Sequence, residues 1–175
     1  GYILSIVGFV MLLISTCIFF NYSSLIKKYS IPFVCYYTII MSYIIGYVGL
    51  QFSASILLLA GIITLVLFSG LSLYAIQTKI DYTQYGGVLL SLLLCLICLN
   101  VMFFFFSIPY VSLIYSGLGS LLFSFYIIYD TQLIVDGNHR SIQFGENDYA
   151  LAAISLYTDI INLFLFLLNI IGGDN

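Results

Sequence analysis

The chain has 175 residues, of which 63% are apolar and only 6% are charged. Soluble globular domains carry roughly 25% charged residues, so this composition excludes an ordinary water-soluble domain. It also excludes intrinsic disorder, which needs low hydrophobicity, and a nucleic-acid-binding surface, for which the 4 basic residues are too few. The composition therefore indicates an integral membrane protein whose main partner is the lipid bilayer.

Six apolar stretches are long enough to cross a bilayer, since a core of about 30 Å needs roughly 20 helical residues. The stretches are too long and too uniformly apolar for the alternating pattern of membrane β-strands. We therefore predict an all-α, polytopic membrane helix bundle that forms one domain over residues 1–175. In chain order the predicted spans are 3–20, 32–50, 54–76, 85–107, 110–134 and 150–171, with a short turn at 51–53.

Basic residues occur only in alternate loops between these spans. Lys27 and Lys28 lie in the first loop, Lys79 lies in the third, and His139 and Arg140 lie in the fifth. The second and fourth loops carry no charge. The positive-inside rule therefore places the Lys- and Arg-bearing loops in the cytosol.

The cysteines all lie inside apolar runs. Two of them have the spacing of a redox or zinc motif, but no second pair and no nearby His accompanies them. We interpret all four as small buried apolar residues, namely Cys17, Cys35, Cys95 and Cys98.

Two acidic residues fall inside predicted spans, Asp130 in the fifth and Asp159 in the sixth. An Asp at mid-membrane costs about 2.5–3.5 kcal/mol on insertion scales, so an intramembrane Asp is a candidate functional residue. Each Asp belongs to a stripe of small and polar residues at steps of three and four, and such a stripe is expected to pack against other helices. The stripes are Ser116, Gly119, Phe123, Tyr126 and Asp130, and Ala152, Ser155, Asp159, Asn162, Phe166 and Asn169.

The residues alone leave two interpretations of these acids open. Asp130 and Asp159 lie about 7–8 Å and about 15 Å from the cytosolic ends of consecutive antiparallel helices, which permits contact without requiring it. If they meet, desolvation and repulsion act against double ionisation, so the pair would share a proton and respond to pH. When ionised, it would offer the oxygen ligands that Ca²⁺ favours, as in a pH-gated cation pathway. Alternatively, each Asp separately hydrogen-bonds neighbouring Tyr, Thr or Asn side chains.

Three motifs follow one another in a specific order and spacing. They are Tyr-Ala-Ile-Gln-Thr-Lys-Ile-Asp-Tyr at 74–82, Phe-Tyr-Ile-Ile-Tyr-Asp-Thr-Gln at 125–132 and Leu-Tyr-Thr-Asp-Ile-Ile-Asn-Leu-Phe at 156–164. Together they resemble the Bax-inhibitor (transmembrane Bax inhibitor motif) family, and the Lifeguard and Golgi anti-apoptotic protein subgroup most. The resemblance covers nearly the whole chain and implies a seven-helix fold, of which this chain is expected to lack the first helix.

The resemblance implies a function as a pH-sensitive calcium-leak channel with an anti-apoptotic role, in the endoplasmic reticulum or Golgi apparatus. In a bacterial relative, two Asp residues on the last two helices form a pH-sensing pair, and Asp130 and Asp159 match them motif by motif. We expect these two, with Tyr126 and Asn162, to form the pH-sensing ion pathway. Ca²⁺ would contact the two Asp side chains transiently as the permeant ion, and no cofactor is expected. The bacterial relative also has an Arg latch on an earlier helix, whereas the only Arg here is Arg140, in a loop.

Two alternative functions fit parts of the pattern. A non-conducting membrane scaffold would regulate cell death only by binding other membrane or apoptosis-regulating proteins. An intramembrane aspartyl protease would also need a Gly-x-Gly-Asp motif, but Gly119 is followed by Ser120, and Asp159 is preceded by Thr158. We therefore predict that the protein is not an enzyme.

Overall fold

The computed structural model describes residues 30–105, 111–135 and 149–173. Within these residues the chain is all-helical, as predicted, and five helices are long and apolar enough to cross a membrane. The span predicted at 3–20 lies outside the described residues. The elements are α3 (Ser30–Gly49), α4 (Ala54–Gln77), the short 3-10 helix η1 (Tyr82–Tyr85), α5 (Gly86–Phe105), α6 (Val111–Ile134) and α7 (Tyr149–Gly172).

The predicted spans and the observed helices agree closely. Each predicted end of these five spans lies within 2 residues of the observed helix end. The turn predicted between α3 and α4 is present, with the backbone N–H of Gln51 donating to Val48 O and that of Phe52 to Gly49 O. Hydrophobic length alone therefore located these helices.

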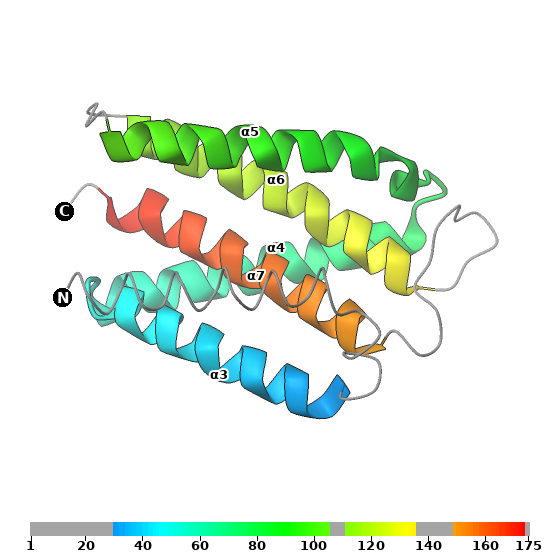
Figure 1. Ribbon diagram of the computed structural model, residues 1–175, viewed down its shortest axis with the longest axis horizontal. Coiled ribbons are helices and arrows are strands. Elements are labelled where there is room, and N and C mark those ends of the chain that lie inside the picture. The colour runs from blue at the N-terminus through cyan, green and yellow to red at the C-terminus, as the bar shows by residue number, and fades with distance from the viewer. Residues whose placement is uncertain (1–29, 106–110, 136–148, 174–175) are drawn as a thin grey trace.

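The last two helices form the centre of the bundle. α6 and α7 share its most extensive contact, α4 packs against both of them, α3 packs on α7, and α5 packs on α6. Figure 1 shows α5 and α3 on opposite sides of this central pair. The facing surfaces of α6 and α7 are consequently the best-shielded part of the described bundle.

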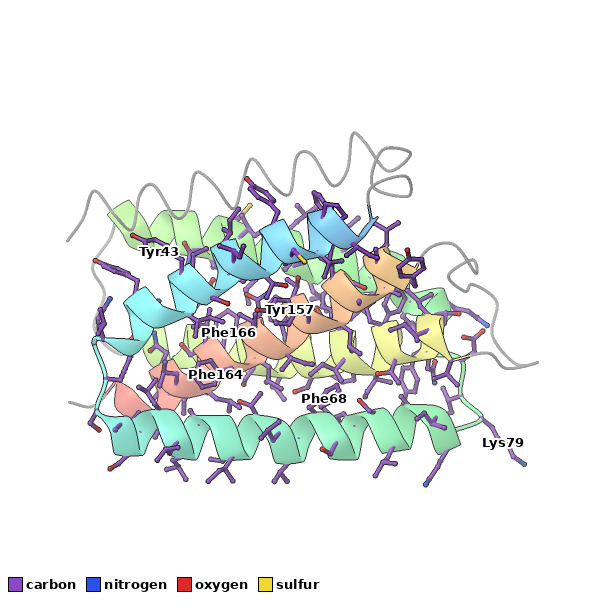
Figure 2. The ribbon with its side chains drawn as sticks, turned by 90° about the horizontal axis from the view of Figure 1, so that it is seen from below. Tyr43, Phe68, Lys79, Tyr157, Phe164 and Phe166 are labelled. Carbon is purple, nitrogen blue, oxygen red and sulfur yellow. The ribbon has the colours of Figure 1, made fainter. Side chains whose placement is uncertain are left out.

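The contact between α6 and α7 is close because α6 has a glycine, Gly119, at the contact. A Cβ at Gly119 would lie 2.5 Å from the ring of Phe166, so only Gly permits this approach. The ring of Phe166 stacks on Phe123, with centroids 5.7 Å apart, and meets Tyr115 edge-on at 5.5 Å. Both α6 and α7 therefore contribute aromatic side chains to one packed layer, of which Figure 2 labels Phe166.

The outward faces of the peripheral helices are apolar, as expected of surfaces that contact lipid. On α4, for example, Leu58, Ile62 and Leu65 are all exposed. The free thiols of Cys35, Cys95 and Cys98 are also exposed. The prediction that the cysteines are buried is wrong for these three, because lipid and protein interiors are both apolar and hydropathy does not distinguish them.

A short loop joins α4 to η1 at one end of the bundle. Lys79 in this loop is exposed and points away from the helices, as Figure 2 shows. The Asp81 carboxylate caps η1 by accepting hydrogen bonds from the backbone N–H and the hydroxyl of Thr83, at 3.0 and 2.6 Å. The loop is thus internally ordered next to the end of α6 that carries Asp130.

Candidate functional site

Asp130 of α6 and Asp159 of α7 meet in the interior of the bundle. Their carboxyl groups interact with each other, and Asp130 also interacts with Ser155. Both acids are buried, with 6% and 5% of their surface exposed. Two neighbouring carboxyl groups can share one proton, so this contact is a candidate for a proton-sharing pair.

The two helices are staggered, which explains why the acids meet although they lie at different distances from the helix ends. Asp130 is 4 residues from Ile134, the last residue of α6, which corresponds to about 6 Å. Asp159 is 10 residues from Tyr149, the first residue of α7, or about 15 Å. Because Asp130 contacts both Asp159 and Ser155, α7 must begin farther out than α6 ends.

The polar atoms of the pair are incompletely satisfied. The Oδ2 atom of Asp159 is buried and has no hydrogen-bond partner among the described residues. The single hydroxyl proton of Ser155 has two candidate acceptors, Ala152 O at 3.2 Å and the Asp130 carboxyl. A buried polar atom without a partner costs about 1–3 kcal/mol, so this site is not optimised for stability alone.

Tyrosines surround the pair. Tyr126, which belongs to the α6 stripe, lies near enough to interact electrostatically with both Asp130 and Asp159. Tyr129 interacts with Asp130, and Tyr37 of α3 interacts with Asp159. Among the described residues no basic side chain contributes to the electrostatic environment of either acid.

Asn162 is placed differently from the prediction that groups it with the acids. Its side-chain N–H donates to Thr158 O, 2.9 Å away in its own helix. Asn162 is only half-buried. The described hydrogen bonds therefore connect Asn162 to the backbone of α7 and not to the acid pair.

Two polar contacts beside the pair were not predicted. The Tyr37 hydroxyl lies 2.8 Å from Thr158 Oγ1, and because Thr158 Oγ1 donates to Ile154 O at 2.7 Å, Tyr37 must be the donor. Gln132 is completely buried and hydrogen-bonds the segment between α4 and η1. Nothing in the sequence distinguishes Tyr37 from the other tyrosines, but an amide inside an apolar span signals that partners must exist.

The pair can offer oxygen ligands to a hard cation. Ca²⁺ takes roughly six to eight oxygens, which is more than two carboxylates supply, so an ion at the pair would keep part of its water shell. Among the described residues, no group of 3 or more His, Cys, Asp or Glu side chains could hold a metal ion.

Comparison with known proteins gives a consistent result. The family profile described as "Inhibitor of apoptosis-promoting Bax1" matches residues 1–175. Protein lifeguard 4 of Mus musculus is 40% identical over 120 residues, which cover 69% of this chain and 48% of that protein. Bax inhibitor 1 of Schizosaccharomyces pombe is 35% identical over 153 residues, 85% of this chain and 55% of that protein. Protein lifeguard 3 of Homo sapiens is 29% identical over 143 residues, 79% of this chain and 45% of that protein, so the chain spans about half the length of these curated relatives.

Proposed function

The chain belongs to the Bax inhibitor and lifeguard family of anti-apoptotic membrane proteins, and on that premise we propose that it is a pH-sensitive calcium-leak channel that suppresses cell death. It is an integral, multi-pass membrane protein. The single observation that supports a pH-sensitive pathway best is the buried contact between Asp130 and Asp159.

The mechanism depends on the proton that the two acids share. Loss of that proton would leave two neighbouring carboxylates that repel each other in surroundings of low dielectric constant. The same change would create the negatively charged oxygens that a passing Ca²⁺ ion needs. Tyr126 would line this pathway beside the pair, and Asn162 would line it one helical turn farther along α7. No cofactor and no catalytic residue takes part in this proposal.

The cellular setting belongs to the same proposal. The protein would reside in the endoplasmic reticulum or Golgi apparatus, with the loop that carries Lys79 on the cytosolic side. A leak from these stores lowers the amount of Ca²⁺ available for release, which connects ion passage to protection from cell death.

The proposal is tested by measuring Ca²⁺ flux against pH in liposomes that contain the purified protein. We expect Asp130→Asn and Asp159→Asn each to flatten the pH dependence of the flux, because an amide cannot lose the shared proton. Asp174→Asn is the matched control, since it removes an acid that the sequence places beyond the last span. Variants of both pair residues that follow the parent curve would rule out the pair as the sensor, and a parent protein that passes no Ca²⁺ would favour a non-conducting scaffold.

A further inference from the structure

The end of α6 that carries Asp130 is connected to several neighbouring segments by consecutive side chains. Asp130 contacts α7, and the next hydroxyl, Thr131 Oγ1, lies 3.4 Å from Ser72 Oγ on α4. On the preceding residue, the Tyr129 hydroxyl fills the space beside Gly86, where a Cβ would lie 2.6 Å from it. This helix end is therefore fixed on more than one side.

Gln132 makes the most extensive of these connections. Its side-chain N–H₂ group donates to Ala75 O at 3.2 Å and to Ile80 O at 3.0 Å, and its Oε1 accepts from the backbone N–H of Tyr82 at 2.7 Å. Both N–H donors and the acceptor are thus used, and the residue is 0% exposed. A buried amide with all three bonds made holds the backbone from the end of α4 to the start of η1 in one position.

The segment that Gln132 holds is itself cross-linked by hydrogen bonds, so we expect it to move as a unit. Asp81 accepts from the N–H and hydroxyl of Thr83 and from the side chain of Gln84, at 3.0, 2.6 and 3.2 Å. Thr83 is 1% exposed. We define residues 78–85, from the end of α4 through η1, as the α4–α5 loop.

The geometry points to Gln132 as a positioning residue for the acid pair, one that also transmits the state of the pair to the α4–α5 loop. Gln132 follows Asp130 by two residues, which turns its side chain by about 200° around the helix. Asp130 therefore faces α7 while Gln132 faces the loop. Any rotation or shift of α6 that changes the contact between Asp130 and Asp159 must strain or break the bonds of Gln132.

This inference rests on the proposed function only in requiring that the pair changes its protonation state. The titratable groups that face the pair are Tyr126 and Tyr129 on α6 and Tyr37 on α3. Lys79 is exposed in the α4–α5 loop and is not among the described partners of the pair. A signal from the pair to the loop would consequently travel through α6 and not through a direct ion pair.

The test is a double-mutant cycle read by hydrogen–deuterium exchange of the backbone amides in peptides that cover residues 78–86. We expect Gln132→Met to speed exchange of this segment between about threefold and about tenfold, as loss of a hydrogen bond predicts. In its protonated form, Gln132→Glu keeps an acceptor for the Tyr82 N–H and one donor for the carbonyls of Ala75 or Ile80, and at low pH it should restore slow exchange of the Tyr82 amide. Thr64→Val is the matched control, because the buried Thr64 hydroxyl donates to Ala60 O in its own helix and, among the described residues, to no other helix.

The transmission step is tested by the other arm of the cycle. In a chain with Gln132 intact, Asp159→Asn should change the exchange rate of residues 78–86 and leave that of the turn at 51–53 unchanged. In a chain that already carries Gln132→Met, Asp159→Asn should have no effect on residues 78–86. Equal exchange in the parent and Gln132→Met, or no response of 78–86 to Asp159→Asn, would overturn the inference. The Asp159→Asn arm decides the matter even if Gln132→Met fails to fold, and because no flux is measured, a failure of the channel proposal is seen separately.

Discussion

The hydroxyl of Tyr37 has a defined hydrogen-bond direction. Thr158 uses its only hydroxyl proton for Ile154 O, so the Tyr37 proton must point to Thr158 Oγ1. The ring of Tyr37 also meets Tyr157 edge-on, with centroids 6.4 Å apart. This residue joins α3 to α7 directly beside Asp159.

Removing that hydroxyl should loosen the attachment of α3. We expect Tyr37→Phe to lower the free energy of unfolding by about 0.6–1.5 kcal/mol, the usual worth of one such hydrogen bond in water or lipid. Thermal unfolding in detergent, followed by circular dichroism, measures the change. Tyr36→Phe is the control, since that neighbouring side chain is 39% exposed, and an equal loss in both variants would contradict the assigned role of Tyr37.

At the scale of elements, the interface between α6 and α7 depends on the absence of a side chain at Gly119. Because Phe166 is enclosed by Phe123 and Tyr115, its ring cannot move aside freely. Gly117, two residues earlier on the same helix, faces open space, with nothing within 4 Å of a Cβ. The two glycines thus separate the effect of close packing from that of helix propensity.

We expect Gly119→Ala to destabilise the bundle by about 1–3 kcal/mol, because the added methyl group overpacks the interface. Gly117→Ala should be neutral or should stabilise the helix by up to about 1 kcal/mol, since Ala is the better helix former. Both values come from unfolding in detergent under the same conditions. If the two variants behave alike, close approach at Gly119 does not stabilise the contact.

The sequence predicts the elements well and their contacts less well, for a physical reason. Length and apolarity determine each span. A carboxylate inside a span is energetically costly, which identifies Asp130 and Asp159 as candidate functional residues. Their contact depends on the stagger of α6 and α7, which no local pattern encodes. The three bonds of Gln132 likewise reach residues 50 to 57 positions away in the chain, so they follow from the fold and not from the neighbouring sequence.

At the scale of the whole molecule, the two loops within the described residues 30–105 lie at opposite ends of the bundle. The turn at 51–53 and the α4–α5 loop lie at opposite ends of α4, a helix of 24 residues, or about 36 Å. Gln51 and Lys79 are both exposed, whereas the thiols of Cys35, Cys95 and Cys98 lie on the apolar outer surface of the helices. Charged reagents are excluded from the hydrocarbon region of a bilayer, so the described native cysteines should react slowly with them.

The proposed orientation therefore predicts opposite labelling of two introduced cysteines. In sealed vesicles with the cytosolic face outward, a membrane-impermeant maleimide should label Lys79→Cys at once and Gln51→Cys only after permeabilisation. The parent protein gives the background from its native thiols. The reverse order would invert the orientation, and labelling of both sites from one side would contradict a span by α4.

The interaction partners of the end of α6 come from segments both before and after it in the chain, and this order has a consequence for biogenesis. Some partners of this helix end, such as Ser72 and Ile80, are synthesised before it, but Ser155 and Asp159 leave the ribosome after it. A nascent chain that has just inserted α6 consequently exposes an unmatched acid until its final helix arrives. Truncated products that lack α7 would keep an unpaired Asp130 side chain within the bilayer, a feature by which the cell's degradation machinery would recognise incomplete chains.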